Sequence, residues 1–214
     1  MSDFNRYAKE LDSICKGYFG ELVSATTELN FANEQYGKYI RPKGVIGFDA
    51  KGLAKAAEVE RNLSIAKERI YRVKTTMLAE TDAKIKSLRT QMKERLDSIF
   101  LADPAAVDPN LLAILDSGML TVGEYERLYE KTAKENNHTM ARLICAAARE
   151  AAGEAKKEED QLRLANLSRK SAVHSSDSYL SAFDDIVGLF ETCSGNPLMA
   201  NRWDECVGPL IKNF

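Results

Sequence analysis

The two histidines of this chain, His138 and His174, could exchange protons near neutral pH and are the first candidates for acid–base or metal chemistry. His138 follows Glu135 with the Glu-x-x-His spacing by which di-iron bundles place two metal ligands on one helix face. Such a site needs a second Glu-x-x-His, but Ser171 stands three residues before His174. We therefore interpret residues 135–138 as a helix end, broken by their Asn-Asn pair, and expect no metal ligand there.

The other residue types that carry chemistry also lack the required spacing. The four cysteines are far apart and form no Cys-x-x-Cys pair, which argues against structural zinc and favours small buried hydrophobic residues in a reducing compartment. Asp184 and Asp185 are adjacent, so on a helix their carboxylates point in different directions. No glycine-rich phosphate loop and no nucleophile motif occurs. We expect no enzyme activity, catalytic residue or cofactor, although carboxylates could still serve as acids and bases.

Apolar residues recur every three or four positions over three long segments, as in helices that pack along a shared seam. They run from Phe4 to Tyr36, from Leu53 to Ile99 and from Leu162 to Cys193. The second segment has no proline and no glycine after Gly52. Its spacing predicts one uninterrupted helix over 51–101, about 75 Å long at 1.5 Å per residue.

These segments predict an all-α protein, an elongated antiparallel helical bundle or coiled coil of three long helices with a small helical cap. Residues 1–101 would form a long helical hairpin, with helices at about 3–36 and 51–101. A loop would connect them at 37–50, where Pro42, Gly44 and Gly47 gather.

The predicted cap comprises residues 102–153, in which short helices carry their own start and stop signals. Asp108 before Pro109 predicts a capped helix start, and Ser117-Gly118 predicts its end. Thr121 and Glu124 have the spacing of a capping box that starts the next helix. Residues 154–214 would form the third long helix and a C-terminal tail that packs on the bundle.

Part of the cap resembles known families. Residues 111–129 resemble the helical hairpin of SHOCT-type short oligomerisation domains, through Leu112-x-x-Leu115-x-Ser117-Gly118-x-Leu120-Thr121-x-x-Glu124-Tyr125-x-x-Leu128. The wider stretch 108–148 is similar to uncharacterised helical proteins encoded among tailed-bacteriophage structural genes, especially at Asn137-x-Thr139-Met140-x-Arg142-Leu143-Ile144. The second resemblance implies a role in virion assembly or host takeover and identifies no active residue.

Charge distinguishes the long segments and bears on their partners. Segment 51–101 has 12 basic and 7 acidic residues, a net charge of +5, whereas segments 1–36 and 154–214 each have a net charge of −3. Complementary packing edges would produce this difference, as would solvated faces with an incidental imbalance. Nucleic acid is a possible but not favoured partner, because acidic residues interrupt the basic strip and neighbouring helices would offset it. The strip comprises Lys38, Arg41, Lys43, Lys67, Arg69, Arg72, Lys74, Lys84, Lys86, Arg89, Lys93 and Arg95.

We therefore expect a non-catalytic helical interaction protein, such as a phage-encoded virion assembly or accessory factor. The alternatives are a phage-encoded inhibitor or regulator that binds a host protein or nucleoprotein complex, and a nucleic-acid-binding helical protein. Neither a secretory signal nor a run of 18 apolar residues is visible, so we expect no membrane association and a host-cytoplasmic or virion-associated location.

The expected partners are proteins, including a second copy of the chain in a homodimer where helix 51–101 pairs with its copy. Two exposed apolar regions could contact them, although packing against the bundle is the alternative for most of these residues. They comprise Tyr39, Ile40, Ile46 and Phe48 in the first loop, and Met119, Leu120, Tyr125 and Tyr129 in the cap.

Overall fold

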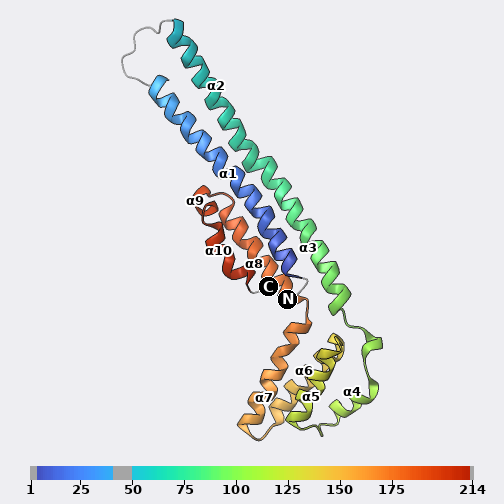
Figure 1. The fold of residues 1–214 in the computed structure, drawn as a ribbon. Helices are drawn as coiled ribbons and strands as arrows, with labels where there is room; N and C mark the ends of the chain where they lie inside the picture. Colours follow the sequence, from blue (N-terminus) through green and yellow to red (C-terminus); the bar gives the residue numbers. More distant parts are fainter. Residues whose placement is uncertain (1–3, 41–49, 213–214) are drawn as a thin grey trace. The chain divides into compact units, whose positions relative to one another are not determined.

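The structure, a computed structural model, describes residues 4–40 and 50–212. All regular secondary structure in these two ranges is helical, which confirms the predicted all-α class (Figure 1). Ile46 and Phe48, which we expected to contact a partner, lie outside the described residues, as does the side chain of Ile40.

The first helix, α1 (Asn5–Ile40), is longer than its spacing predicts. We expected it to end near Tyr36, with Gly37 opening a loop, but it continues to Ile40. A glycine costs a helix only about 1 kcal/mol relative to alanine, which the next turn of good helix formers can offset.

The chain is helical without a break from Ala50 to Phe100, which confirms the predicted long second helix. It consists of α2 (Ala50–Arg72), a π-helical turn (Val73–Met77) and α3 (Leu78–Phe100). The π turn lies where the apolar repeat lengthens from seven residues, in alternating three- and four-residue steps, to eleven residues. The wider turn therefore coincides with the point at which the apolar seam shifts around the helix.

The third expected long helix is not confirmed. The segment is divided into α7 (Glu158–Arg169), a 3-10 helix (Lys170–His174) and α8 (Asp177–Cys193). After the break, the Ser175 hydroxyl accepts a hydrogen bond from the Asp177 amide at 3.2 Å at the start of α8. Polar residues in the middle of the apolar seam therefore end the helix rather than merely weaken it.

The chain forms two compact units whose boundaries lie within α3 and α8. Residues 1–89 and 182–214 make up what we call the hairpin unit, and residues 90–181 make up the middle unit. We expected divisions near residues 101 and 153 instead. Because the third segment is broken, its two halves belong to different units, and the specific arrangement of three long antiparallel helices is not confirmed.

In the hairpin unit, α1 runs antiparallel to α2 and the start of α3 (Figure 1). Two short helices, α9 (Pro197–Ala200) and α10 (Trp203–Ile211), pack with α8 beside the N-terminal half of α1. The rings of Phe19 and Phe190 lie 5.3 Å apart, and those of Phe19 and Trp203 lie 5.0 Å apart. This aromatic cluster covers the N-terminal half of α1, where the third long helix was expected.

Charge complementarity is present at two points of the hairpin unit. Arg69 of the basic segment pairs with Glu21 and Glu28 of α1. Arg89 donates two hydrogen bonds of 2.7 Å to the Asp184 carboxylate of α8. These pairs join the basic segment to both segments with a net negative charge. Exposed ion pairs of this kind each contribute only about 0–1 kcal/mol to the free energy of folding. They therefore select one alignment of the paired helices but add little to its stability.

The middle unit contains a 3-10 turn (Pro104–Ala106) and helices α4 (Pro109–Asp116), α5 (Val122–Lys134), α6 (His138–Glu154) and α7. The predicted caps are confirmed: Asp108 accepts hydrogen bonds from two amides of α4, and the Glu124 carboxylate accepts from the Thr121 amide at 2.7 Å. The core includes Leu115, Ile144 and Leu167.

Within the described residues, no single helix combines the length and apolar character needed to cross a bilayer. One bent pair, 51–106 with 109–116, meets the length and composition criteria jointly, with an angle of 84° between its parts.

Replacing Gly17 or Gly20 with alanine should stabilise the hairpin unit. Both glycines are exposed in the middle of α1, and a Cβ atom added at either position would meet nothing within 4 Å. Each change should raise the free energy of unfolding by about 0.5–1 kcal/mol, because glycine loses more backbone entropy on folding. Urea denaturation followed by Trp203 fluorescence measures this. Unchanged or lower stability in both variants would contradict an intact helix there.

Candidate functional site

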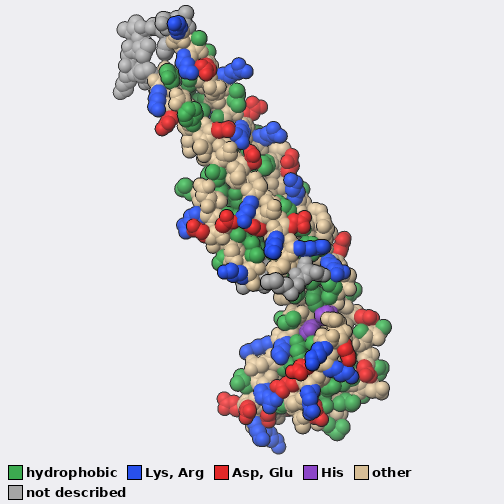
Figure 2. Space-filling view, in the orientation of Figure 1, with side chains coloured by type: hydrophobic (Ala, Val, Ile, Leu, Met, Phe, Trp, Pro, Cys, Tyr) green, Lys and Arg blue, Asp and Glu red, His purple; other side chains and the backbone are tan. Residues whose placement is uncertain are grey.

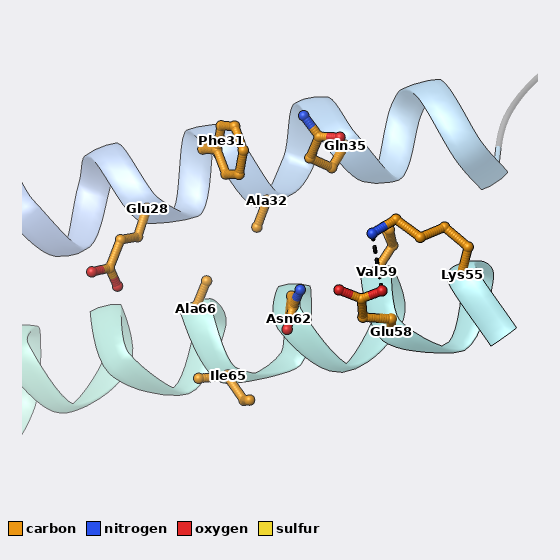
Figure 3. Close-up of a pocket in the computed structure, with 10 residues that line it drawn as sticks. All are labelled: Glu28, Phe31, Ala32, Gln35, Lys55, Glu58, Val59, Asn62, Ile65 and Ala66. Atoms are coloured by element: carbon orange, nitrogen blue, oxygen red, sulfur yellow. Dashed lines mark hydrogen bonds and ion pairs between the residues drawn. The ribbon is translucent and has the colours of Figure 1, made fainter.

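A groove of about 360 Å³ lies between α1 and α2 in the hairpin unit, towards the ends joined by residues 41–49 (Figure 3). Ala32 and Ala66 point into the gap between the two helices and form its floor. Phe31 and Ile65 also line the groove, and their side chains are 63% and 53% exposed. Two large apolar side chains thus stand exposed beside two small ones.

The core beneath this groove is small because only two helices contribute to it. It consists of Ala32, Leu63 and Ala66, with Leu29 and Tyr36 packed against them. A two-helix contact through alanines buries little apolar area, and apolar burial stabilises by only about 25 cal/mol per Å². This end of the hairpin would therefore gain stability from further cover.

The charged residues at the groove are already paired within the chain. Lys55 lies 2.9 Å from Glu58, and this carboxylate raises the pKa of the Lys55 ammonium. Glu28 pairs with Arg69, whose pKa is raised by Glu28 and Glu21. The space-filling view shows hydrophobic side chains interspersed among charged ones on this part of the hairpin unit (Figure 2). The groove is apolar at its centre and close to electrically neutral at its edge.

Among the residues expected to contact a partner, the structure separates exposed from buried ones. Tyr39 is 43% exposed at the end of α1, and Met119 is 79% exposed before α5; both remain predicted contact residues. Leu120 is half-buried against the core of the middle unit. Tyr125 and Tyr129 are 2% and 9% exposed. These two tyrosines form the core face of α5, which corrects the expectation that they lie on an accessible surface.

The sequence interpretation missed Phe31 and Ile65. Both lie outside the apolar seam, so a search for seam positions does not select them. A local signal was nevertheless present, because on each helix a large apolar residue comes directly before a seam alanine, Phe31 before Ala32 and Ile65 before Ala66. This pair of residues places a large exposed side chain beside a small buried one.

The basic strip on residues 51–100 is exposed only in part. Lys67, Arg72 and Lys84 are among its exposed members. Arg69 and Arg89 are half-buried and bound to carboxylates, so they are engaged within the fold. The strip is therefore interrupted by intramolecular pairs as well as by acidic neighbours in the sequence.

The two histidines come together in the middle unit, 36 residues apart in the chain. The Nδ1 atoms of His138 and His174 are 2.8 Å apart, and His174 Nε2 is 3.0 Å from the Tyr129 hydroxyl. His138 begins α6, His174 ends the 3-10 helix, and Tyr129 comes from α5. The Phe100 ring lies against His138, with 4.8 Å between ring centroids. The sequence interpretation did not pair these histidines.

This geometry allows at most one proton between the two Nδ1 atoms, so the pair holds together with both rings neutral or with a single shared charge. Burial lowers the pKa of both rings, and the nearby Arg142 guanidinium lowers both further. At neutral pH the rings are therefore uncharged, and Tyr129, His174 and His138 form a hydrogen-bonded chain. Such a chain fixes α5, α6 and the 3-10 helix relative to one another.

The remaining residues that could carry chemistry have structural surroundings that explain them. Asn136, with a φ of 56°, and Asn137, which caps α6, separate Glu135 from His138, which confirms the predicted helix end. Cys15, Cys145 and Cys193 are buried, as expected. Burial raises the pKa of the Cys15 thiol to about 12 and that of Cys145 to about 11, so both are protonated at neutral pH. Within the described residues, no three His, Cys, Asp or Glu side chains are grouped to hold a metal ion.

No family model, curated protein or solved structure matches this chain.

Proposed function

We propose that this protein is a non-catalytic helical interaction protein that associates with a second copy of itself through the groove between α1 and α2. The observation that carries the proposal is the placement of exposed Phe31 and Ile65 beside Ala32 and Ala66. Contiguous exposed apolar residues rimmed by polar ones are typical of protein interfaces.

The groove is complementary to itself. In an interface with twofold symmetry, the same patch of both copies must supply the protruding side chains and the spaces that receive them. Phe31 and Ile65 protrude, whereas Ala32 and Ala66 leave room for side chains of the facing copy. One surface therefore holds both halves of a knobs-into-holes contact.

The edge of the groove also favours a second copy. Glu28 and Glu58 are each bound to a basic residue of their own chain, so two identical edges can approach without strong repulsion. Gln35 and Asn62 line the groove, and each amide both donates and accepts hydrogen bonds. The side-chain amides of two facing copies can therefore hydrogen-bond to each other, with either copy as the donor.

Association would complete the core at this end of the hairpin. Two hairpins packed face to face form a four-helix arrangement, the commonest way to bury the apolar faces of paired helices. The antiparallel bundle that the sequence predicts within one chain would then be formed between two chains. It differs from the homodimer expected from the sequence, in which helix 51–101 pairs with its copy, because residues of both α1 and α2 line the groove.

Sedimentation velocity over about 1–100 µM protein tests the proposal. We expect a concentration-dependent dimer, and we expect Phe31→Glu or Ile65→Glu to weaken it at least tenfold, because an unpaired carboxylate would be buried. Tyr71→Glu is the matched control, since Tyr71 is on the same hairpin, 68% exposed and outside the groove lining. A wild-type monomer throughout the range, or equal effects of Phe31→Glu and Tyr71→Glu, would exclude this interface.

The biological setting follows from the resemblance of residues 108–148 to phage-encoded helical proteins, and we propose a virion assembly or accessory role. Self-association supports that role, because assembly factors act by bringing copies together. The alternative is a host-directed inhibitor or regulator. A monomer that forms a one-to-one complex with a host protein in a mass measurement would favour this alternative.

A further inference from the structure

A second groove, in the middle unit, carries positive charge instead of apolar side chains. It lies between α6 and the segment formed by α7 and the following 3-10 helix, with a volume of about 820 Å³. Arg142 and Arg149 line it from α6, and Arg169 lines it from the end of α7. Glu150 is the one acidic residue among the described residues that line it.

The floor of this groove is open because its residues are small. Along α6, Arg142, Ala146, Arg149 and Gly153 follow one another at steps of four, three and four residues, so they share one helix face. Arginines and small residues alternate on this face. A Cβ atom added at Gly153 would meet nothing within 4 Å. The guanidinium groups therefore border a space that a ligand can enter.

The three guanidinium groups have no ion pair in the described part of the chain. Arg163, also on α7, differs because it is held by the Glu126 carboxylate. Glu150 also lines the groove, and no ion pair joins it to these guanidinium groups within the described residues. Three arginines against one glutamate leave the lining with a net charge of +2.

Arg142 strengthens this argument because it is half-buried. Its charge reaches the ring of His138 and the ring of His174, and it opposes the protonation of both. A guanidinium that is partly removed from water and makes no ion pair within the described residues gains from a bound anion. An anionic ligand in the groove would supply that counter-charge.

We propose that the groove of Arg142, Arg149 and Arg169 binds consecutive phosphate groups of a linear oligophosphate, supplied by a nucleic-acid strand or by a free oligophosphate compound. Arg142 and Arg149 are separated by two helix turns, about 10 Å along α6, which exceeds the reach of one phosphate. Arginine binds phosphate oxygens through paired, planar hydrogen bonds.

The lining also indicates which part of a nucleic acid would be contacted. None of the described residues that line this groove is aromatic, whereas single-strand sites that hold bases stack them on aromatic rings. Contact would therefore be with the phosphate backbone and independent of base sequence. This site is separate from the basic strip on residues 51–100, and it does not depend on the self-association proposed above.

The test uses the full-length protein and a fluorescein-labelled single-stranded DNA of 20 nucleotides, with binding followed by anisotropy. We expect the double variant Arg142→Ala/Arg149→Ala to bind at least tenfold more weakly. Its plot of log affinity against log salt should be shallower by about 1.4, at roughly 0.7 per lost phosphate contact. Arg169→Ala alone should weaken binding in the same direction.

The matched control is Lys131→Ala/Lys134→Ala, which removes two exposed positive charges from the same unit but outside the groove. It should bind the DNA within about twofold of the wild type. Displacement of the DNA by inorganic tripolyphosphate would identify free oligophosphate as an accepted source of the phosphates, and failure to displace it would identify the nucleic-acid strand. Absence of binding to both probes, or equal losses in the two double variants, would overturn the proposal. Circular dichroism confirms that each variant is folded.

Discussion

Replacing Phe190 with alanine should lower the free energy of unfolding of the hairpin unit by about 3–5 kcal/mol. Phe190 is 1% exposed, and its ring centroid lies 5.5 Å from that of Tyr18 and 5.3 Å from that of Phe19. The change removes apolar contacts and leaves a cavity in a cluster that joins α8 to α1. Since these aromatic rings take the place of the expected third long helix, their loss should affect the whole unit.

Urea denaturation followed by Trp203 fluorescence measures this effect, because the single tryptophan of the chain packs against Phe19 in the same cluster. Leu198→Ala is a suitable control, since Leu198 is 76% exposed on the neighbouring α9. It should change stability by less than about 0.5 kcal/mol. A loss below about 1 kcal/mol in Phe190→Ala would show that the aromatic cluster is not the main contact between α8 and α1.

Replacing His174 with phenylalanine should destabilise the middle unit by about 2–4 kcal/mol, since the buried Tyr129 hydroxyl and the half-buried His138 ring lose their partner. The phenylalanine ring is similar in size, but it cannot accept a hydrogen bond from the Tyr129 hydroxyl or form one with His138 Nδ1. The same substitution should reduce the dependence of stability on pH. Hydrogen exchange of the α6 amides, measured by mass spectrometry for wild type and variant at equal pH, follows both effects.

The sign of the pH effect follows from the lowered pKa values of His138 and His174. The unfolded chain, with a histidine pKa of about 6.5, takes up protons at a higher pH than the folded protein. The wild type should therefore keep full stability above about pH 7.5 and lose it as the pH falls through about 6.5 towards the folded values. Equal pH dependence in wild type and His174→Phe would contradict the neutral histidine chain. Tyr129→Phe, which removes one hydroxyl, should cost less than His174→Phe.

Short-range features of this fold could be predicted from the sequence because they depend on residues within one or two helix turns. The apolar repeat predicts the continuous helix over 51–101, which the structure has at 50–100. Asp108, Thr121 and Glu124 predict the starts of α4 and α5. The error at the end of α1 also has a local origin. Gly37 was expected to open a loop, but a single glycine costs a helix only about 1 kcal/mol and does not by itself end it.

The third segment shows where a repeat alone misleads. Its seam contains Arg169 and Ser176, and a seam with polar members fits either a weakened helix or two helices with a turn between them. Tertiary contacts decide between these outcomes. The turn allows His174 to face Tyr129, while Phe190 packs on Tyr18 in the other unit.

The all-α class, the long second helix, the local caps and the lack of familiar catalytic motifs can be recognised in the amino-acid sequence, because each depends on residue spacing along one segment. Three-dimensional packing is needed to bring His138 to His174, to bury Tyr125 and Tyr129, and to place Phe31 and Ile65 at one groove. Those facts depend on which helix faces pack together, and packing is selected by the burial of distant segments against one another, which no local repeat encodes.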